Sequence, residues 1–282
     1  MPASSSCSCS GRSLHEALPT WSVPQNCSNV RRLRRCLARQ ELRNSQRAVK
    51  CQVAAGSQVG RKYNGQFGEW TLEETDKQEV LGYRTGLSLA ALAAVLETVI
   101  ALEGDSGFLR HLLGDWQNLI IISGAVSLGV SMHLIHIYVK PLKQFMQLMY
   151  LTGTIAAAYF AATQGVPLPE YVAEHHASLW LIGPFFAAIT GLAFKEGICY
   201  GKFECAALFF VTPAMIIGDM SGLLSGAPQQ AAHVVFAGLF AAFAAGKWTQ
   251  PIKDDIGDKS VFEFLALPEE EQHARQQQMG QR

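Results

Sequence analysis

Charged residues are scarce in this chain. Only 16% of its 282 residues are Asp, Glu, Lys or Arg, whereas 49% are hydrophobic. A soluble chain ordinarily carries about 25% charged residues, which keep its surface in water. The composition therefore argues against a soluble protein and favours one that lies in a membrane.

The sequence also lacks the motifs that mark common catalytic and cofactor sites. It contains no G-x-S-x-G, H-E-x-x-H, Walker A or dinucleotide-binding glycine pattern, and no paired C-x-x-C. From residue 52 onward, fourteen basic residues stand against twenty-one acidic ones, a balance that disfavours nucleic-acid binding. We therefore expect a protein that is not an enzyme and binds no nucleic acid, and the sequence leaves any cofactor unknown.

Cysteine is nearly absent after residue 51. Five of the seven cysteines lie within residues 1–51, which leaves Cys199 and Cys205. Their C-x5-C spacing matches no known redox or zinc motif, so we expect no disulfide framework. Two buried free thiols are the favoured interpretation, and a redox-sensitive pair is the alternative.

Acidic residues are nearly absent from residues 1–51, where only Glu16 and Glu41 accompany nine serines and eight arginines. Such a composition is typical of an organellar transit peptide. The ending VKC at 49–51 resembles a chloroplast processing site and predicts cleavage after Cys51. A mitochondrial presequence and a basic tail that binds an acidic partner are the alternatives.

Six apolar runs follow, each close to the roughly 20 residues that a spanning helix needs. They cover approximately residues 82–102, 116–139, 144–163, 178–194, 205–224 and 231–248. The sequence therefore predicts an all-α membrane protein, a bundle of six transmembrane helices over residues 82–248, with short N- and C-terminal segments on the stromal side.

Lysine and arginine are concentrated in every second loop between the apolar runs. They gather before the first run, between the second and third, between the fourth and fifth, and after the sixth, whereas the other three loops contain only Arg110. Short basic loops stay on the side from which insertion begins. Both termini are therefore expected in the stroma, with the protein in the thylakoid in preference to the inner envelope. The mitochondrial inner membrane is the alternative.

The segment before the first run, residues 52–81, carries a short amphipathic pattern. Its Asn64-Gly65 pair is typical of a hairpin turn. We expect Trp70 to anchor this segment at the membrane surface, because tryptophan favours the interface between lipid and water.

The segment after the sixth run, residues 249–267, contains Val261 and Phe262 in an expected short surface helix. These two residues and Trp70 are the candidates for docking a partner. Residues 268–282, rich in Glu and Gln, are expected to form a disordered tail because they have little apolar surface to bury.

Two histidines, His133 and His136, lie inside the second apolar run. On a helix they would fall within about 60° of each other and of Lys140, as one semi-polar strip near the stromal surface. The favoured interpretation is a pair of interfacial residues that bond a neighbouring helix. The alternatives are a proton or substrate path and a metal or haem ligand. Because two histidines are too few for a metal site, we predict none.

Four other ionisable residues lie at membrane depth. Glu97 and Asp219 are near the expected lumenal ends of the first and fifth runs, and Lys195 and Glu196 are near the stromal end of the fourth. Charged groups there are functional candidates because their burial is unfavourable. With the two histidines, they make up our candidates for transport or relay. The alternative is that these side chains simply reach the water at either surface.

Several blocks of the sequence resemble a known family. They are YNGQFGEW with LEETD at 63–76, HIY at 136–138, GLAFKE at 191–196 and QPIKDDIGDKSVFEFL at 250–265. Over about residues 62–265 the chain is similar to an uncharacterised integral membrane family, a domain of unknown function, of cyanobacteria and plastids. The resemblance implies a plastid membrane protein and supplies no activity. That family often has histidine at the position of Asp219, which counts against a fixed chemical role for this residue.

Two functions remain open. The first is transport of a small solute or ion, with proton coupling, through the relay candidates. The second is a non-catalytic assembly or scaffold role for a photosynthetic membrane complex, through the flanking segments. An intramembrane metalloenzyme that adds His175 or His176 is disfavoured, because these histidines are expected at the opposite surface. The lipid bilayer is the partner that the sequence indicates directly, and the oligomeric state is unknown.

Overall fold

The computed structural model describes residues 60–104 and 107–280. The predicted transit peptide of residues 1–51 and its cleavage site lie outside the described residues. Two short strands, β1 (Lys62–Asn64) and β2 (Glu69–Thr71), open the described part as an antiparallel hairpin that pairs Tyr63 with Trp70.

Six helices of the described residues are long and apolar enough to span a membrane. They are α2 (Glu74–Glu103), α4 (Gln117–Leu134), α5 (Lys140–Thr163), α7 (Leu179–Tyr200), α8 (Phe203–Met220) and α9 (Ala227–Lys247). The prediction of an all-α membrane bundle is therefore confirmed.

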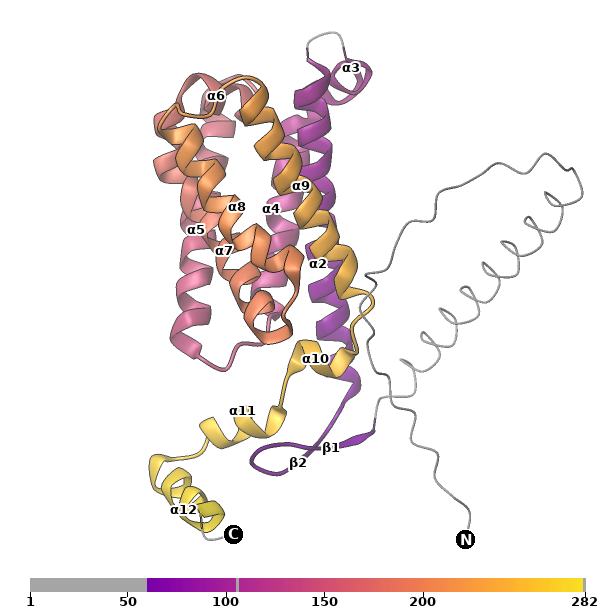
Figure 1. Ribbon diagram of the computed structural model, residues 1–282, viewed down its shortest axis with the longest axis vertical. Coiled ribbons are helices and arrows are strands. Elements are labelled where there is room, and N and C mark those ends of the chain that lie inside the picture. Colours follow the sequence, from indigo (N-terminus) through magenta and orange to yellow (C-terminus); the bar gives the residue numbers. More distant parts are fainter. Residues whose placement is uncertain (1–59, 105–106, 281–282) are drawn as a thin grey trace, which may run out of the picture. The chain divides into compact units, whose positions relative to one another are not determined.

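The six helices pack in chain order around a ring, and α9 closes the ring against α2. Figure 1 shows them side by side with alternating directions. The most extensive contacts are those of α2 with α4 and of α7 with α5 and α8. Small residues permit the first of these: a Cβ at Gly124 would lie 2.6 Å from the Ala93 Cβ, and a Cβ at Gly86 would lie 2.5 Å from the Ser127 carbonyl oxygen. Glycine is needed at both positions because the two backbones approach closely.

Shorter elements cover the two ends of the bundle. At one end lie α3 (Phe108–Leu113), η1 (Gly114–Trp116), α6 (Leu168–Glu174) and η2 (His176–Ser178); we call it the far end. At the other lie the hairpin, α10 (Ile252–Ile256) and α11 (Lys259–Leu265). We call these three elements the cap, and this end the cap end (Figure 1).

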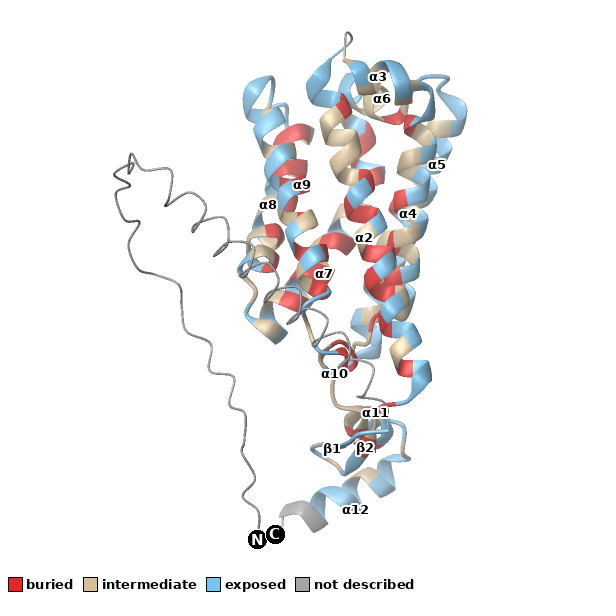
Figure 2. Ribbon diagram, turned by 90° about the vertical axis from the view of Figure 1, so that its right-hand side faces the viewer, coloured by how far each residue is buried: buried red, intermediate tan, exposed pale blue. Residues whose placement is uncertain are grey.

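The bundle has an apolar outside as well as an apolar core. Leu87, Ile189, Leu192 and Leu208 are among the buried residues of the core. Large exposed hydrophobic residues occur on all six spanning helices, and Figure 2 shows exposed outer faces along their length. An apolar exterior of this kind is what contact with lipid requires, since the hydrocarbon interior of a bilayer is as apolar as a leucine side chain.

The cap has a small core of its own, formed by Trp70, Leu72, Val80, Ile252 and Ile256. Asp258 and Ser260 hold the hairpin loop, because Asp258 Oδ2 accepts from the Gln66 N–H at 2.6 Å and Ser260 Oγ accepts from the Phe67 N–H at 3.0 Å. A side chain at Gly65 would collide with both residues. The two flanking segments, far apart in sequence, thus fold together.

Two expectations for the flanking segments need correction. Trp70 is only 7% exposed and packs against Tyr63, so it lies inside the cap and not at a lipid surface. Residues 269–280 form a helix, α12 (Glu269–Gly280), where we expected disorder. Three glutamates in its first turn complement the helix dipole, and Glu, Gln, Ala and Arg are good helix formers.

The second span is shorter than predicted. α4 ends at Leu134, and Ile135 has extended backbone angles. Side chains of α5 satisfy carbonyls in the last turn of α4: Lys143 Nζ donates to the His133 carbonyl at 2.8 Å, and Gln147 Nε2 donates to the Met132 carbonyl at 3.2 Å. These contacts replace the hydrogen bonds that a continued helix would have made.

Candidate functional site

Four buried ionisable side chains meet at the cap end, and each comes from a different helix. They are Arg84 of α2, Glu196 of α7, Lys247 of α9 and Asp255 of α10, which we call the ionic network. None of them is more than 4% exposed. Charged side chains are rarely buried to this degree unless they are paired.

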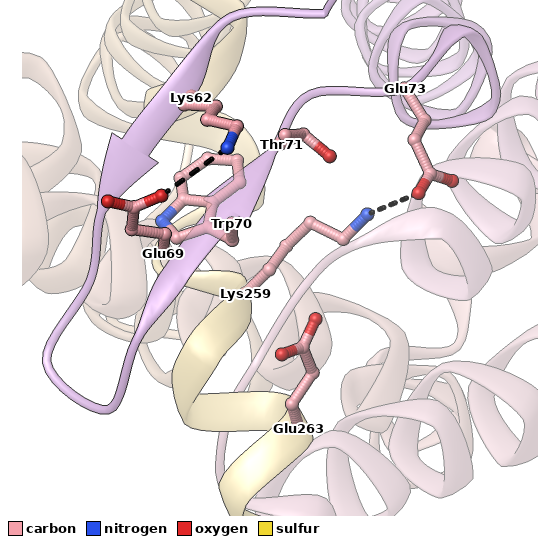
Figure 3. Close-up of a pocket in the computed structure, with 7 residues that line it drawn as sticks. All are labelled: Lys62, Glu69, Trp70, Thr71, Glu73, Lys259 and Glu263. Carbon is pink, nitrogen blue, oxygen red and sulfur yellow. Dashed lines mark ion pairs between the residues drawn. The ribbon is translucent and has the colours of Figure 1, made fainter.

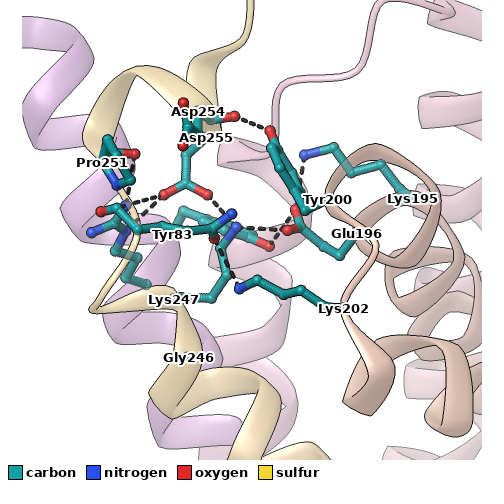
Figure 4. A network of polar contacts seen from close by, with 12 residues as sticks. Tyr83, Lys195, Glu196, Tyr200, Lys202, Gly246, Lys247, Pro251, Asp254 and Asp255 are labelled. Atoms are coloured by element: carbon teal, nitrogen blue, oxygen red, sulfur yellow. Dashed lines mark hydrogen bonds and ion pairs between the residues drawn. The ribbon is translucent and has the colours of Figure 1, made fainter. Parts of the chain in front are cut away.

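Lys247 lies at the centre of the network, between two carboxylates. Its Nζ donates to Glu196 Oε2 at 2.7 Å and forms an ion pair with Asp255 Oδ1. The rings of Tyr83 and Tyr200 flank it, with centroids 5.3 Å and 5.4 Å from Nζ (Figure 4). An ammonium over aromatic rings gains further electrostatic attraction.

Arg84 ties the C-terminal segment to the first spanning helix. Its Nε donates to Asp255 Oδ2 at 2.7 Å, and its Nη2 also contacts this oxygen. The same Nη2 donates to the Gln250 carbonyl at 3.0 Å. The chain leaving α9 is therefore held to α2 by both side-chain and backbone contacts.

Glu196 has a second cation. Lys195 Nζ donates to Glu196 Oε1 at 2.9 Å, and the Tyr83 hydroxyl contacts the same oxygen at 3.4 Å. Three cations, Lys195, Lys247 and Arg84, thus face two carboxylates. Each carboxylate contacts two cations, so Lys247 can release either one without leaving an unpaired negative charge.

The rim of the network holds Lys202 and Asp254, which lie outside the spanning helices. Burial lowers the pKa of the Lys202 ammonium, and nearby Lys247 lowers it further. Burial also raises the pKa of the Asp254 carboxyl, although Lys253 opposes this shift. The Tyr200 hydroxyl donates to the Asp254 carbonyl, which joins the end of α7 to α10.

The structure brings some of the predicted candidates into this network. Glu196 belongs to it and Lys195 contacts Glu196, and the role of both as relay candidates stays a prediction. Arg84, Lys247 and Asp255 were missed: the first two were counted only as basic residues at the membrane surface, and Asp255 lies in the resembling block QPIKDDIGDKSVFEFL. A lysine that ends an apolar helix shortly before a pair of aspartates was the signal that could have found them.

The expected strip of His133, His136 and Lys140 does not exist. The helix stops at Leu134, so only His133 is helical, and Lys140 is the first residue of α5. His136 Nε2 lies 3.2 Å from a Glu79 carboxylate oxygen and its ring packs edge-on against Phe262. Burial lowers the pKa of His136, and Glu79 opposes this effect.

Two other candidates lie away from the network. The Glu97 carboxylate accepts a hydrogen bond from Gln117 Nε2 at 3.3 Å. Asp219, 5% exposed, accepts from Gln229 Nε2 at 3.1 Å and lies 3.5 Å from His233 Nε2. Both sites are in the half of the bundle nearer the far end, since Glu97 is near the end of α2 and Asp219 near the end of α8.

The three docking candidates differ in how far they are buried. Trp70 is buried, which argues against its contact with a partner. Phe262 is half-buried and packs against Tyr138 with ring centroids 4.6 Å apart, and Val261 is also half-buried.

Cys205 is buried as expected, but Cys199 is exposed, so the expectation of two buried thiols is wrong for Cys199.

A surface pocket of about 270 Å³ lies beside the hairpin (Figure 3). It is lined by Lys62, Glu69, Trp70, Thr71, Glu73, Lys259 and Glu263. Both lysines are already paired: Lys62 with Glu69 at 3.6 Å, and Lys259 with Glu73 at 3.9 Å. The pocket therefore offers few unpaired charges to a ligand.

Among the described residues, no three His, Cys, Asp or Glu side chains are placed to hold a metal ion.

One comparison with known protein families gives a match over part of the chain. Residues 130–264 match the family model DUF2301, described as an uncharacterized integral membrane protein. The predicted resemblance to an uncharacterised integral membrane family is thereby confirmed over these residues, which include Glu196, Lys247 and Asp255. A search of curated proteins and a search of solved structures find no match.

Proposed function

We propose that the protein transports a small solute or ion, coupled to protons, and that the ionic network is the gate at the cap end. The observation that carries this proposal is the complete burial of Glu196 and Lys247 in a bundle that spans a membrane. Buried ion pairs are seldom better for stability than apolar residues of the same volume, and their best-attested use is in specificity and switching. Ionisable groups at membrane depth mark ion and substrate pathways in many membrane proteins.

The arrangement of charges supports a gate that can open. Because Glu196 also contacts Lys195 and Asp255 also contacts Arg84, Lys247 can move away while both carboxylates stay neutralised. Lys247 ends α9, and Arg84 joins α2 to the segment that follows α9. A movement of α9 relative to α2 and α7 would therefore make and break these contacts. A gate needs such a two-state element.

The location is part of the same proposal. The composition of residues 1–51 supports import into a plastid, with the mitochondrion as the alternative. The basic residues of the cap end support a stromal position for both termini, in the thylakoid in preference to the inner envelope. Import of the labelled full chain into isolated chloroplasts tests this: a shortened, protease-protected product is expected, and a full-length product that protease degrades would contradict it.

Reconstitution tests transport. Purified protein in liposomes is expected to raise proton flux above that of protein-free liposomes, and Lys247→Met is expected to change this flux. Asp219→Asn and His136→Ala probe the other relay candidates. Glu263→Gln, at an exposed position of α11, is the matched control and should leave the flux unchanged. A parent flux equal to that of empty liposomes, over protons and common small ions, would exclude the proposal.

A scaffold role is the second candidate, and the cap favours it. The cap joins both flanking segments, and Phe67 stacks on Phe264 with ring centroids 3.9 Å apart. Such a preformed surface suits docking to a photosynthetic membrane complex. Leu265 is 43% exposed on α11, so Leu265→Ser should remove the protein from a native-gel complex without unfolding the cap. A protein that migrates alone, with or without this substitution, would exclude the scaffold.

A further inference from the structure

We propose that Glu97 and Gln117 form a proton-binding site in the interior of the bundle, in which one proton joins the Glu97 carboxyl to the Gln117 amide. The site lies between α2 and α4, toward the end of the bundle opposite the ionic network. Proton binding at this site does not require that the protein transport any solute or ion, so this inference is independent of the transport proposal.

When Glu97 is ionised, one oxygen of each side chain in the pair lacks a hydrogen bond, and a single added proton would supply it. Gln117 is 2% exposed, and its Nε2 donates to Glu97 Oε2 at 3.3 Å. The second oxygen of each side chain, Glu97 Oε1 and Gln117 Oε1, is buried with no hydrogen-bond partner among the described residues. Both are acceptors when the carboxyl is ionised, so neither can satisfy the other. A proton on Glu97 turns its Oε1 into a donor and permits the reciprocal acid–amide pair.

The surrounding packing holds in place the two helix segments that carry these side chains. One turn before Glu97, Ala93 lies against Gly124 in the tight α2–α4 contact. Ile100, one turn after Glu97, is fully buried. Next to Gln117, the Asn118 side chain accepts a hydrogen bond from the Leu168 N–H at 2.8 Å, which fixes the start of α4 against α6. These contacts fix the two helix segments from which Glu97 and Gln117 extend.

No cation pairs with Glu97 in the part of the chain that the structure describes. The ionisable residues near the far end on α2 and on the elements packed against it are Glu103, Arg110, His111, Asp115 and His233. Glu103 accepts from the Leu109 N–H, Arg110 pairs with Glu170, and His233 pairs with Asp219. Glu97 is half-buried with its Oε1 inaccessible to solvent, where an ionised carboxylate without a cation is unfavourable, and uptake of a proton removes the charge.

Dicyclohexylcarbodiimide tests the proposal because it reacts with protonated carboxyls in apolar surroundings. The carboxyl proton moves to a carbodiimide nitrogen while the carboxylate oxygen adds to the central carbon. The resulting O-acylisourea rearranges to a stable N-acylurea, and no other reactant is consumed. The adduct is located by peptide mass spectrometry on the full-length protein in detergent.

We expect Glu97 to be labelled about tenfold more than exposed Glu103 at about pH 6, with labelling reduced at about pH 9. Glu103 is the matched control in the same helix, so the comparison needs no variant. Glu97→Gln should remove the adduct and keep the melting temperature, because a neutral amide can still pair with Gln117. Equal labelling of Glu97 and Glu103 would overturn the proposal. Protection of Glu97 by sodium or potassium at constant pH would also overturn it, in favour of a metal-cation site.

Discussion

Asp255→Asn should destabilise the protein more than most single substitutions, and the reason lies in Arg84. Asp255 is the only carboxylate paired with Arg84 among the described residues, and both side chains are at most 4% exposed. Removing one partner of a buried pair typically costs about 3–5 kcal/mol because the other charge stays buried and uncompensated. We expect a loss in this range, since Asn keeps the size of the side chain and removes only its charge.

The double variant Arg84→Met/Asp255→Asn separates charge pairing from packing. It removes one cation and one anion, which leaves the net charge of the network unchanged. We expect it to be more stable than the sum of the single losses predicts, with a coupling energy of about 1–3 kcal/mol. Lys253→Gln, at an exposed position of α10, is the control and should cost less than about 1 kcal/mol.

The assay is unfolding of the purified protein in detergent, followed by tryptophan fluorescence. Trp70 in the cap and Trp248, which donates to Ser88 Oγ at 2.9 Å, both report on this end of the bundle. A loss below about 1 kcal/mol for Asp255→Asn, or additive losses in the double variant, would refute the reasoning that the pair is buried and mutually dependent.

Three further predictions follow from contacts near the cap. Burial lowers the pKa of His136, so the unfolded chain binds a proton at this residue more readily than the folded chain does. The melting temperature should therefore fall as the pH drops below about 6.5. In His136→Gln the melting temperature should depend less steeply on pH. Asp258→Ala should cost about 1–2 kcal/mol and speed amide exchange in the hairpin, because Asp258 caps α11 and holds the hairpin loop; unchanged exchange would contradict this. A maleimide should label exposed Cys199 and leave buried Cys205 unlabelled in the folded protein. Equal labelling of the two thiols would contradict the burial of Cys205.

Much of the fold could be predicted from sequence because it depends on local composition. Runs of about 20 apolar residues identify spanning helices whatever their neighbours are. Asn64-Gly65 indicated the hairpin correctly, but the positive φ in the loop is at Gly68, and Gly65 is needed because a side chain there would collide with Asp258 and Ser260. The end of α4 could not be predicted, because Lys143 and Gln147 of the next helix satisfy its last carbonyls.

The candidate site was harder to predict because its contacts are distant in sequence. Glu196 and Lys195 were found as charges at membrane depth, but Arg84 and Asp255 are separated by 171 residues. Nothing in the local pattern shows that these two residues meet. Trp70 was misplaced for the same reason: its burial depends on Ile252 and Ile256, which come from the other end of the described chain.

The link between Arg84 and Asp255 also constrains how the protein is made. A ribosome synthesises the first spanning helix long before it reaches α10, so Arg84 has no carboxylate partner of its own while five more spanning helices emerge. The network can close only after translation has passed Asp255. A chain truncated after α9 would hold every spanning helix and still leave the Arg84 guanidinium unpaired. Completion of the C-terminal segment is therefore the step at which the Arg84 charge gains its carboxylate partner.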